Sequence, residues 1–325
     1  MLAAYVEKPN KDNPLSALVV GQRPDPQPRD GWEIVRVEAC SLNRHDIWSL
    51  QGVTQHPPLP LPMILGCDAS GRRADGTPVI LYPGAKGDGG SREDETLDPC
   101  FNVFSELAQG TMADYVIAPV RSILPRPERI PALDGAALGT TWLTAYRAIF
   151  SKARLRPGQC MLVQGSSGGL STALVQLGVA AGLEVWVASR SSDGHSLAER
   201  LGAHRTWARG TALPHKVDAV FDSVGESTWN HSLESVKRGG TVVVLGRTTG
   251  ANATTNIPSV FRPQIKIVGT QLGTLNEMRD MVNFVAMAGL RPVIGKTMPL
   301  EHAEAGFRAM LEGSVQGKIV FTRPD

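Results

Sequence analysis

The chain has 325 residues and a mass of 34.8 kDa, with 42% hydrophobic residues, 20% charged residues and a formal net charge of +2. At roughly 100–200 residues per domain, this length predicts two domains with separate cores and excludes a small disulfide-stapled protein. The charges are spread along the chain, with no basic stripe for nucleic acid and no polybasic arm for a membrane surface. We therefore expect a small-molecule partner, no nucleic acid and no membrane.

The cysteines are Cys40, Cys67, Cys100 and Cys160, which lie far apart without a CxxC pair. This spacing favours a reducing compartment over a disulfide framework or a structural zinc ribbon. The amino-terminal MLAAYVEKPNKD lacks the regions of a signal peptide, and no segment reaches the ~18 uninterrupted apolar residues of a membrane helix. These features predict a cytoplasmic protein.

The first 125 residues are rich in Pro and Gly and contain short apolar alternations, such as WEIVRVEA at 32–39 and ADYVIAP at 113–119. This pattern is typical of short strands between turns, so we predict a mostly-β domain. Prolines in PRPERIPALD at 125–134 interrupt local structure and mark the end of this domain.

Strand and helix patterns then alternate. Short apolar strands between amphipathic helices indicate a parallel sheet covered on both faces, which is a doubly wound α/β domain. From about residue 263, a strand-like QIKIVGT, two amphipathic segments and a terminal GKIVFT either extend this sheet or return to the first domain. The predicted strands of the alternating part are 160–165, 184–189, 217–223 and 240–246, and the predicted helices are 169–182, 196–202 and 227–238.

A glycine-rich turn, VQGSSGGLSTALVQL at 163–177, joins the first of these strands directly to a helix. Small residues there let the backbone approach a pyrophosphate, whose charge the helix N-terminus stabilises. Ser171 stands where the third glycine of GxGxxG would be. The turn also matches GxSxG, a hydrolase nucleophile motif, with Ser167 as nucleophile and Asp222 and His302 in the required order. A hydrolase elbow follows several earlier strands of its sheet, so we favour the dinucleotide site.

The type of dinucleotide follows from the end of the second strand, where an NAD site would place an acidic residue. The sequence there offers Ser189, Arg190 and Ser191 instead. A guanidinium suits a 2′-phosphate, and no carboxylate ends the strand, so we predict NADP.

The order of the parts resembles the medium-chain dehydrogenase/reductase superfamily, and its zinc-independent quinone oxidoreductase-like branch in particular. The resemblance implies an α/β fold with a GroES-like mostly-β catalytic domain, residues 1–125 and 263–325, plus a doubly wound Rossmann nucleotide-binding domain, residues 126–262. It also implies a homodimer, for which the strand-like GTQLG at 269–273 could supply the edge. The motifs that carry it are SLNRHDIW, LGCDASG, GTMADYV, LTAY, GSSGG, DSVG, VVVLGR and GKIVF.

The turn residues and the resemblance together predict the site. The resemblance assigns Asn43 and Thr144 to positioning the nicotinamide and its ribose. The predicted catalytic residues are Asn43 and Thr144, and the predicted cofactor-binding residues are Asn43, Thr140, Thr144, Gly165, Ser166, Ser167, Gly168, Gly169, Leu170, Ser189, Arg190, Ser191, Ser223, Val224, Gly246, Arg247 and Lys318.

We expect no metal, because Asn43, Cys67 and Thr140 stand where zinc-dependent members hold their ion, and such a set binds zinc poorly. An unconventional site built from Cys40, His45, Cys67 and Asp68 stays open, against their role as buried or local polar residues.

Without a Lewis acid, hydride addition to an electrophilic carbon is favoured over alcohol oxidation. We therefore expect an NADPH-dependent reductase of quinones or α,β-unsaturated carbonyls, whose selectivity depends on loops 52–63 and 84–100. No side chain is assigned as proton donor. The alternatives are a zinc-type alcohol dehydrogenase, an enoyl-thioester reductase, an NADPH-binding regulator and an α/β-hydrolase.

Overall fold

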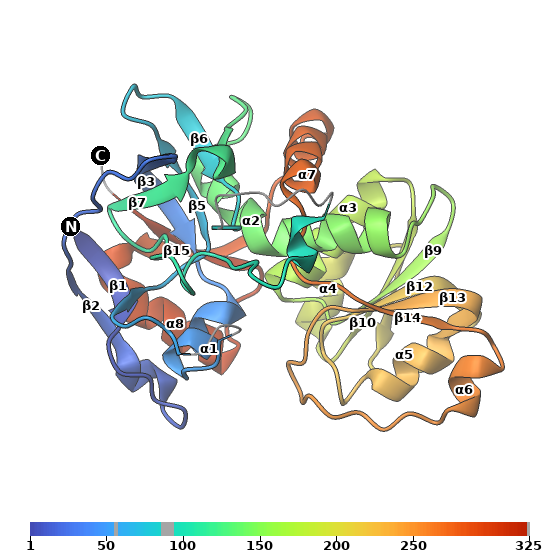
Figure 1. Ribbon diagram of the computed structural model, residues 1–325. Helices are drawn as coiled ribbons and strands as arrows, with labels where there is room; N and C mark the ends of the chain where they lie inside the picture. The colour runs from blue at the N-terminus through green and yellow to red at the C-terminus, as the bar shows by residue number, and fades with distance from the viewer. Residues whose placement is uncertain (55–57, 86–93, 324–325) are drawn as a thin grey trace. The chain divides into compact units, whose positions relative to one another are not determined.

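The computed structural model describes residues 1–54, 58–85 and 94–323 (Figure 1), so parts of both selectivity loops lie outside the described residues. The chain forms two compact units: the first contains Met1–Thr140 and Thr274–Asp325, and the second contains Thr141–Gly273. The boundaries between the units follow residues 140 and 273, whereas the sequence indicated boundaries after residues 125 and 262. The second boundary lies later because the strand within QIKIVGT pairs inside the second unit's sheet.

The first unit is built on two β-sheets. The small sheet has the order β2-β1-β4, and the large one the order β15-β16-β3-β5-β6-β8, with β7 pairing alongside β3. All pairs are antiparallel except β15 with β16, which is parallel. The strands are β1 (Leu2–Val6), β2 (Leu18–Gln22), β3 (Trp32–Ser41), β4 (Met63–Ile64), β5 (Asp68–Arg72), β6 (Pro78–Leu81), β7 (Tyr115–Pro119), β8 (Ile123–Pro125), β15 (Ile294–Pro299) and β16 (Lys318–Thr322).

One hydrophobic core joins both ends of the sequence within this unit. Alternate residues of β3 enter the core, as expected for a half-buried strand. Phe307 on α8 and Phe321 on β16 stack there with ring centroids 6.3 Å apart. The terminal segment therefore returns to the first unit. The helices are α1 (Arg44–Leu50), α2 (Ala132–Arg147), which continues into the second unit, α7 (Leu275–Ala288) and α8 (Ala303–Glu312).

The second unit is a six-stranded parallel sheet with the order β11-β10-β9-β12-β13-β14. In chain order this is 3-2-1-4-5-6, the order of a doubly wound dinucleotide-binding fold. The predicted fold class is confirmed. The strands are β9 (Cys160–Gln164), β10 (Glu184–Ser189), β11 (Arg205–Ala208), β12 (Val217–Asp222), β13 (Val236–Val244) and β14 (Lys266–Gly269), and the helices are α3 (Gly169–Ala180), α4 (Ser192–Arg200), α5 (Trp229–Ser235) and α6 (Pro258–Phe261).

The central strands form because they are mostly apolar and buried. Every residue of β9 is buried, and β10 has the bounds predicted from its sequence. The sequence pattern did not predict strand β11, because this strand lies at the sheet edge and has no buried residue. None of the helices in the described ranges is long and apolar enough to cross a bilayer.

Candidate functional site

The carboxylate of Asp68 is the centre of a buried polar network in the first unit. The β3–β5 register places Ser41 opposite Asp68, and Ser41 Oγ donates to Asp68 Oδ2 at 3.1 Å. Asn43 Nδ2 donates to the same oxygen at 2.8 Å. The other oxygen accepts from the backbone N and the Oγ1 of Thr140, at 2.7 and 2.6 Å. This fully buried carboxylate is therefore hydrogen-bonded through both oxygens.

The ammonium of Lys318 completes the network. Pairing of β16 with β3 carries Lys318 to this point, where it is only 3% exposed. Its Nζ donates to Asn43 Oδ1 at 2.5 Å and to the Leu42 carbonyl at 3.0 Å, and lies 3.4 Å from Asp68 Oδ2. An ammonium has three donors, so three acceptors satisfy it. The result is a buried ion pair whose polar atoms are matched.

Helix α2 can approach Asp68 only because residue 139 is glycine. A Cβ at Gly139 would lie 2.3 Å from Asp68 Oδ1. The close approach brings Thr140 onto the carboxylate, and Thr144 follows one turn later as a buried residue. Three predicted site residues, Asn43, Thr140 and Lys318, thus meet in one network. Asp68, at its centre, was not among the predicted cofactor-binding residues.

A second buried cluster lies beside this network. His45 Nδ1 is 3.5 Å from Cys67 Sγ, and His45 Nε2 is 3.2 Å from Glu106 Oε1. The thiol of Cys67 also donates to the Phe104 carbonyl at 3.2 Å. Asp46 accepts backbone N–H bonds at both oxygens, from Asn43 at 2.7 Å and from Gly66 at 2.8 Å.

Burial and charge shift the pKa values of this cluster. Burial raises the pKa of the Cys67 thiol well above its ordinary value, and the charges of nearby carboxylates raise it further. Burial alone would lower the pKa of His45, but the hydrogen bond with Glu106 and the adjacent carboxylates outweigh it and raise that pKa. Of the unconventional metal set that the sequence left open, Cys40 lies in the hydrophobic core and Asp68 is held by Lys318, so only His45 and Cys67 come together.

In the second unit, the predicted cofactor residues gather at the carboxyl ends of the parallel strands. Gly165, with φ +89°, turns the chain between β9 and α3, and Ser166 Oγ is 2.7 Å from Ser189 Oγ at the end of β10. Ser223 and Val224 follow β12, and their carbonyls accept from Thr248 Oγ1 at 3.0 Å and Thr249 N at 2.9 Å in the loop after β13. That loop also holds Gly246 and Arg247. The edge includes the point between β9 and β12 where the strand order reverses, and ligands bind at this point in such folds.

Two arginines lie at this edge without an ion-pair partner among the residues that the structure describes. Arg190 follows β10, and Arg209 follows β11, with its backbone N donating to the Ser189 carbonyl at 2.9 Å. Arg209 Nη1 donates to Ser227 Oγ at 2.8 Å, beyond β12. Burial and the charge of Arg190 lower the pKa of Arg209, while the charge of Asp222 acts in the opposite direction. Sequence analysis missed Arg209 because it had missed the strand before it.

The hydrolase alternative assigns Asp222 to orienting a histidine. Its carboxylate instead accepts from the backbone N of Val224 and Gly225 at 2.9 Å each, and from Thr228 Oγ1 and Ser232 Oγ at 2.8 and 2.6 Å. Asp222 thus shapes the loop after β12, which is a different task from that of a triad acid.

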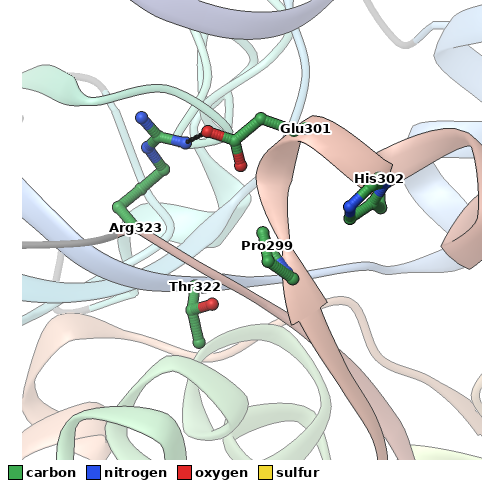
Figure 2. A pocket seen from close by; sticks show the side chains of 5 residues that line it. All are labelled: Pro299, Glu301, His302, Thr322 and Arg323. Carbon is green, nitrogen blue, oxygen red and sulfur yellow. Dashed lines mark hydrogen bonds and ion pairs between the residues drawn. The ribbon is translucent and has the colours of Figure 1, made fainter.

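A separate pocket of about 420 Å³ lies on the first unit and is lined by Pro299, Glu301, His302, Thr322 and Arg323 (Figure 2). Arg323 donates to Glu301 Oε1 and to Asp114 Oδ1, both at 2.6 Å, so its charge is compensated. The pocket contains none of the predicted cofactor-binding residues, only His302 of the hydrolase alternative, and we leave it out of the candidate site.

Two family models match the chain: the alcohol dehydrogenase GroES-like domain over residues 29–128, and the zinc-binding dehydrogenase over residues 169–287. The quinone oxidoreductase of Mus musculus is 28% identical over 315 residues, which cover 91% of this chain and 90% of that protein. A zinc-type alcohol dehydrogenase-like protein of Leptosphaeria maculans is 27% identical and covers 94% of each chain. A solved NAD-dependent alcohol dehydrogenase superposes with a TM-score of 0.92 at 28% identity, over 100% of both chains.

The fold and these matches define an oxidoreductase made of a GroES-like domain and a Rossmann domain. The chain belongs to the medium-chain dehydrogenase/reductase superfamily, as the order of its motifs predicted.

The positions that hold zinc in zinc-dependent members do not fit that metal in this chain. Asn43 Oδ1 accepts from the Lys318 ammonium at 2.5 Å, and Thr140 Oγ1 donates to Asp68. The ammonium already supplies positive charge at this point, and an amide and a hydroxyl are weak zinc ligands. We assign no reaction step to a metal at these positions.

The buried ion pair gives a stability prediction. Lys318→Met leaves the Asp68 carboxylate buried without its cation, so it should lower the free energy of unfolding by about 3–5 kcal/mol. Arg308→Met, which breaks the exposed pair with Glu304, is the matched control and should cost less than about 0.5 kcal/mol. Urea unfolding followed by circular dichroism measures both, and equal losses would contradict the central role of Lys318.

Proposed function

We propose that this oxidoreductase uses NADPH to reduce a quinone or an α,β-unsaturated carbonyl compound without a catalytic metal. The observation that carries the proposal is the Lys318 ammonium, which pairs with Asp68 and donates to Asn43, one of the positions where zinc-dependent members hold their ion. Sequence similarity to a quinone oxidoreductase over nine-tenths of both chains supports the substrate class. A substrate that is already electrophilic needs no Lewis acid to accept hydride.

When bound, the cofactor supplies a hydride, which adds to the β-carbon of an enone or to a quinone ring, and the proton that balances the reduction comes from water. The chain's part is to hold the reactants. Asn43 is fixed in one orientation, because its Oδ1 accepts from Lys318 and its Nδ2 donates to Asp68. Such preorganised dipoles cost no reorganisation during the reaction. We assign Asn43 and Thr144 to positioning the nicotinamide and its ribose.

The choice of NADPH over NADH rests on Arg190 and Arg209. Neither forms an ion pair in the described ranges, although the charge of Asp222 acts on Arg209, and both follow strands on the side of the sheet where the adenosine half of a dinucleotide would lie. A phosphate monoester can accept charge-assisted hydrogen bonds from both guanidinium groups. The similar solved structure is NAD-dependent by its description, so this chain would differ from it in cofactor.

We also propose that the protein is a homodimer joined through the second unit. Strand β14 pairs only with β13 and so leaves its other edge open within the described chain. Ile267 on this strand is exposed, as are Ile257 and Phe261 in the preceding segment. An open apolar edge favours pairing with the same edge of a second copy.

Light scattering at micromolar concentration should give twice the chain mass, and the mass of one chain would refute the dimer. The cytoplasmic location stays a prediction.

The proposed activity is tested by NADPH oxidation against a panel of quinones and a panel of enones, before and after treatment with a chelator. Turnover should appear with one of the panels and survive chelation, because no step depends on a metal. Enoyl thioesters and simple alcohols serve as comparison substrates. Turnover confined to the alcohols, and abolished by the chelator, would favour the zinc-type alcohol dehydrogenase.

Cofactor choice is tested by Arg190→Ala and Arg209→Ala. Each substitution removes a charged donor and should weaken NADPH binding by about 1.5–3 kcal/mol, with little effect on NADH. Arg200→Ala, at the exposed far end of α4, is the control and should change neither affinity. Equal dissociation constants for NADPH and NADH in the unsubstituted protein would contradict the assignment.

Substitutions in the glycine turn distinguish a dehydrogenase function from a hydrolase function. A Cβ at Gly168 would meet no described atom within 4 Å, so Gly168→Val should fold normally and lose NADPH binding only through contact with the pyrophosphate. Ser167→Ala should cost about 0.5–1.5 kcal/mol in NADPH binding and retain most reduction. Esterase activity that disappears in Ser167→Ala would instead identify a nucleophile. Fluorescence titration with NADPH and an ester hydrolysis assay measure these outcomes.

A further inference from the structure

The cluster of His45, Asp46, Cys67 and Glu106 takes no part in the proposed reduction. It is a mixed set of one thiol, one imidazole and two carboxylates, which come from the N-terminal turn of α1, the residue before β5 and the loop before β7. All four side chains are buried or nearly so. Such a set of sulfur, nitrogen and oxygen donors is of the kind that binds zinc in proteins.

The spacing of the donor atoms suits one tetrahedral ion. With bonds of about 2.3 Å to sulfur and 2.0–2.1 Å to nitrogen, two tetrahedral zinc ligands lie roughly 3.5 Å apart. The distance between Cys67 Sγ and His45 Nδ1 is 3.5 Å. One ligand atom from each of His45, Asp46 and Cys67 lies within 4.8 Å of the other two.

The groups around these atoms are arranged as an outer shell. Metal-bound histidines usually donate their other ring nitrogen to a carboxylate, and His45 Nε2 is 3.2 Å from Glu106 Oε1. The two backbone N–H bonds to Asp46 fix the plane of its carboxylate and leave each oxygen a further lone pair. The donor atoms are thus oriented before any ion arrives.

The charge in this region also favours a cation. Asp46, Asp68 and Glu106 place three carboxylates around the Cys67 thiol, and the cations facing them are Lys318 and, when protonated, His45. Lys318 is already committed to Asp68 and Asn43. Buried charges in proteins are normally paired or coordinate a metal, and a divalent ion at this cluster would lie among these carboxylates.

We propose that His45 Nδ1, Asp46 and Cys67 form a binding site for one thiophilic divalent cation, with zinc as the preferred ion and Glu106 as the outer partner of His45. Only Cys67 is shared with the positions that hold zinc in zinc-dependent members, so the ligand set is a different one. Three protein ligands leave one coordination position open. The site does not rest on the proposed reductase function, and the reduction assigned to the Lys318 network does not require it.

Cobalt(II) is the probe, because a cobalt–thiolate bond gives a charge-transfer absorption that does not depend on activity. The full-length protein, stripped with a chelator, should bind one Co²⁺ per chain with this absorption, and Zn²⁺ should displace it. Cys67→Ser should abolish the thiolate band. Glu106→Gln should weaken binding by about 10–100-fold, the range for outer-shell partners. Cys100→Ser changes an exposed thiol and should keep full binding.

Circular dichroism of every variant shows that the fold is kept. The site is refuted if the stripped protein takes up neither ion, if the band persists in Cys67→Ser, or if Cys100→Ser loses it. Reduction is assayed on the same stripped sample. Loss of reduction with intact cobalt binding would support the site and contradict metal-free reduction. Retained reduction without cobalt binding would refute the site and support metal-free reduction.

Discussion

The first unit depends on the need to satisfy one buried carboxylate. Asp68 has no contact with water, so every group that stabilises its charge must come from the chain itself. Those groups come from the end of β3, the residue before α1, the start of β16 and the middle of α2. The same requirement explains why Gly139 is small, why Thr140 faces the sheet, and why the carboxyl-terminal strand lies beside β3.

Consecutive residues serve two different clusters at this point. Asp68 begins β5 and binds the ammonium, while Cys67 just before it contacts an imidazole and a backbone carbonyl. The two clusters affect each other electrostatically, since the charges of Asp68 and Lys318 act on the Cys67 thiol with opposite signs. A change at either position should therefore be felt at both, although each cluster has its own set of hydrogen bonds.

Sequence patterns predicted the second unit well, because its central strands are mostly apolar and its glycine turn follows directly from local sequence. They placed the boundary near 263 too early, because the partner of β14 is set by pairing across the sheet and not by its own residues. They also missed the role of Asp68, which depends on partners such as Lys318, 250 residues away. Arg209 was missed for a related reason, since the edge strand before it has no buried residue.

The separation of Asp68 and Lys318 along the chain has a consequence for how the protein acquires its structure. The second unit is one continuous stretch, so it can fold from contacts within itself, whereas the first unit must close a loop that contains the entire second unit. During synthesis Asp68 emerges 250 residues before its cation, so it should be without that partner until β16 arrives. Docking of that last strand should be the slow step, and the segment around Asp68 should be the part of the nascent chain most exposed to proteases until it occurs.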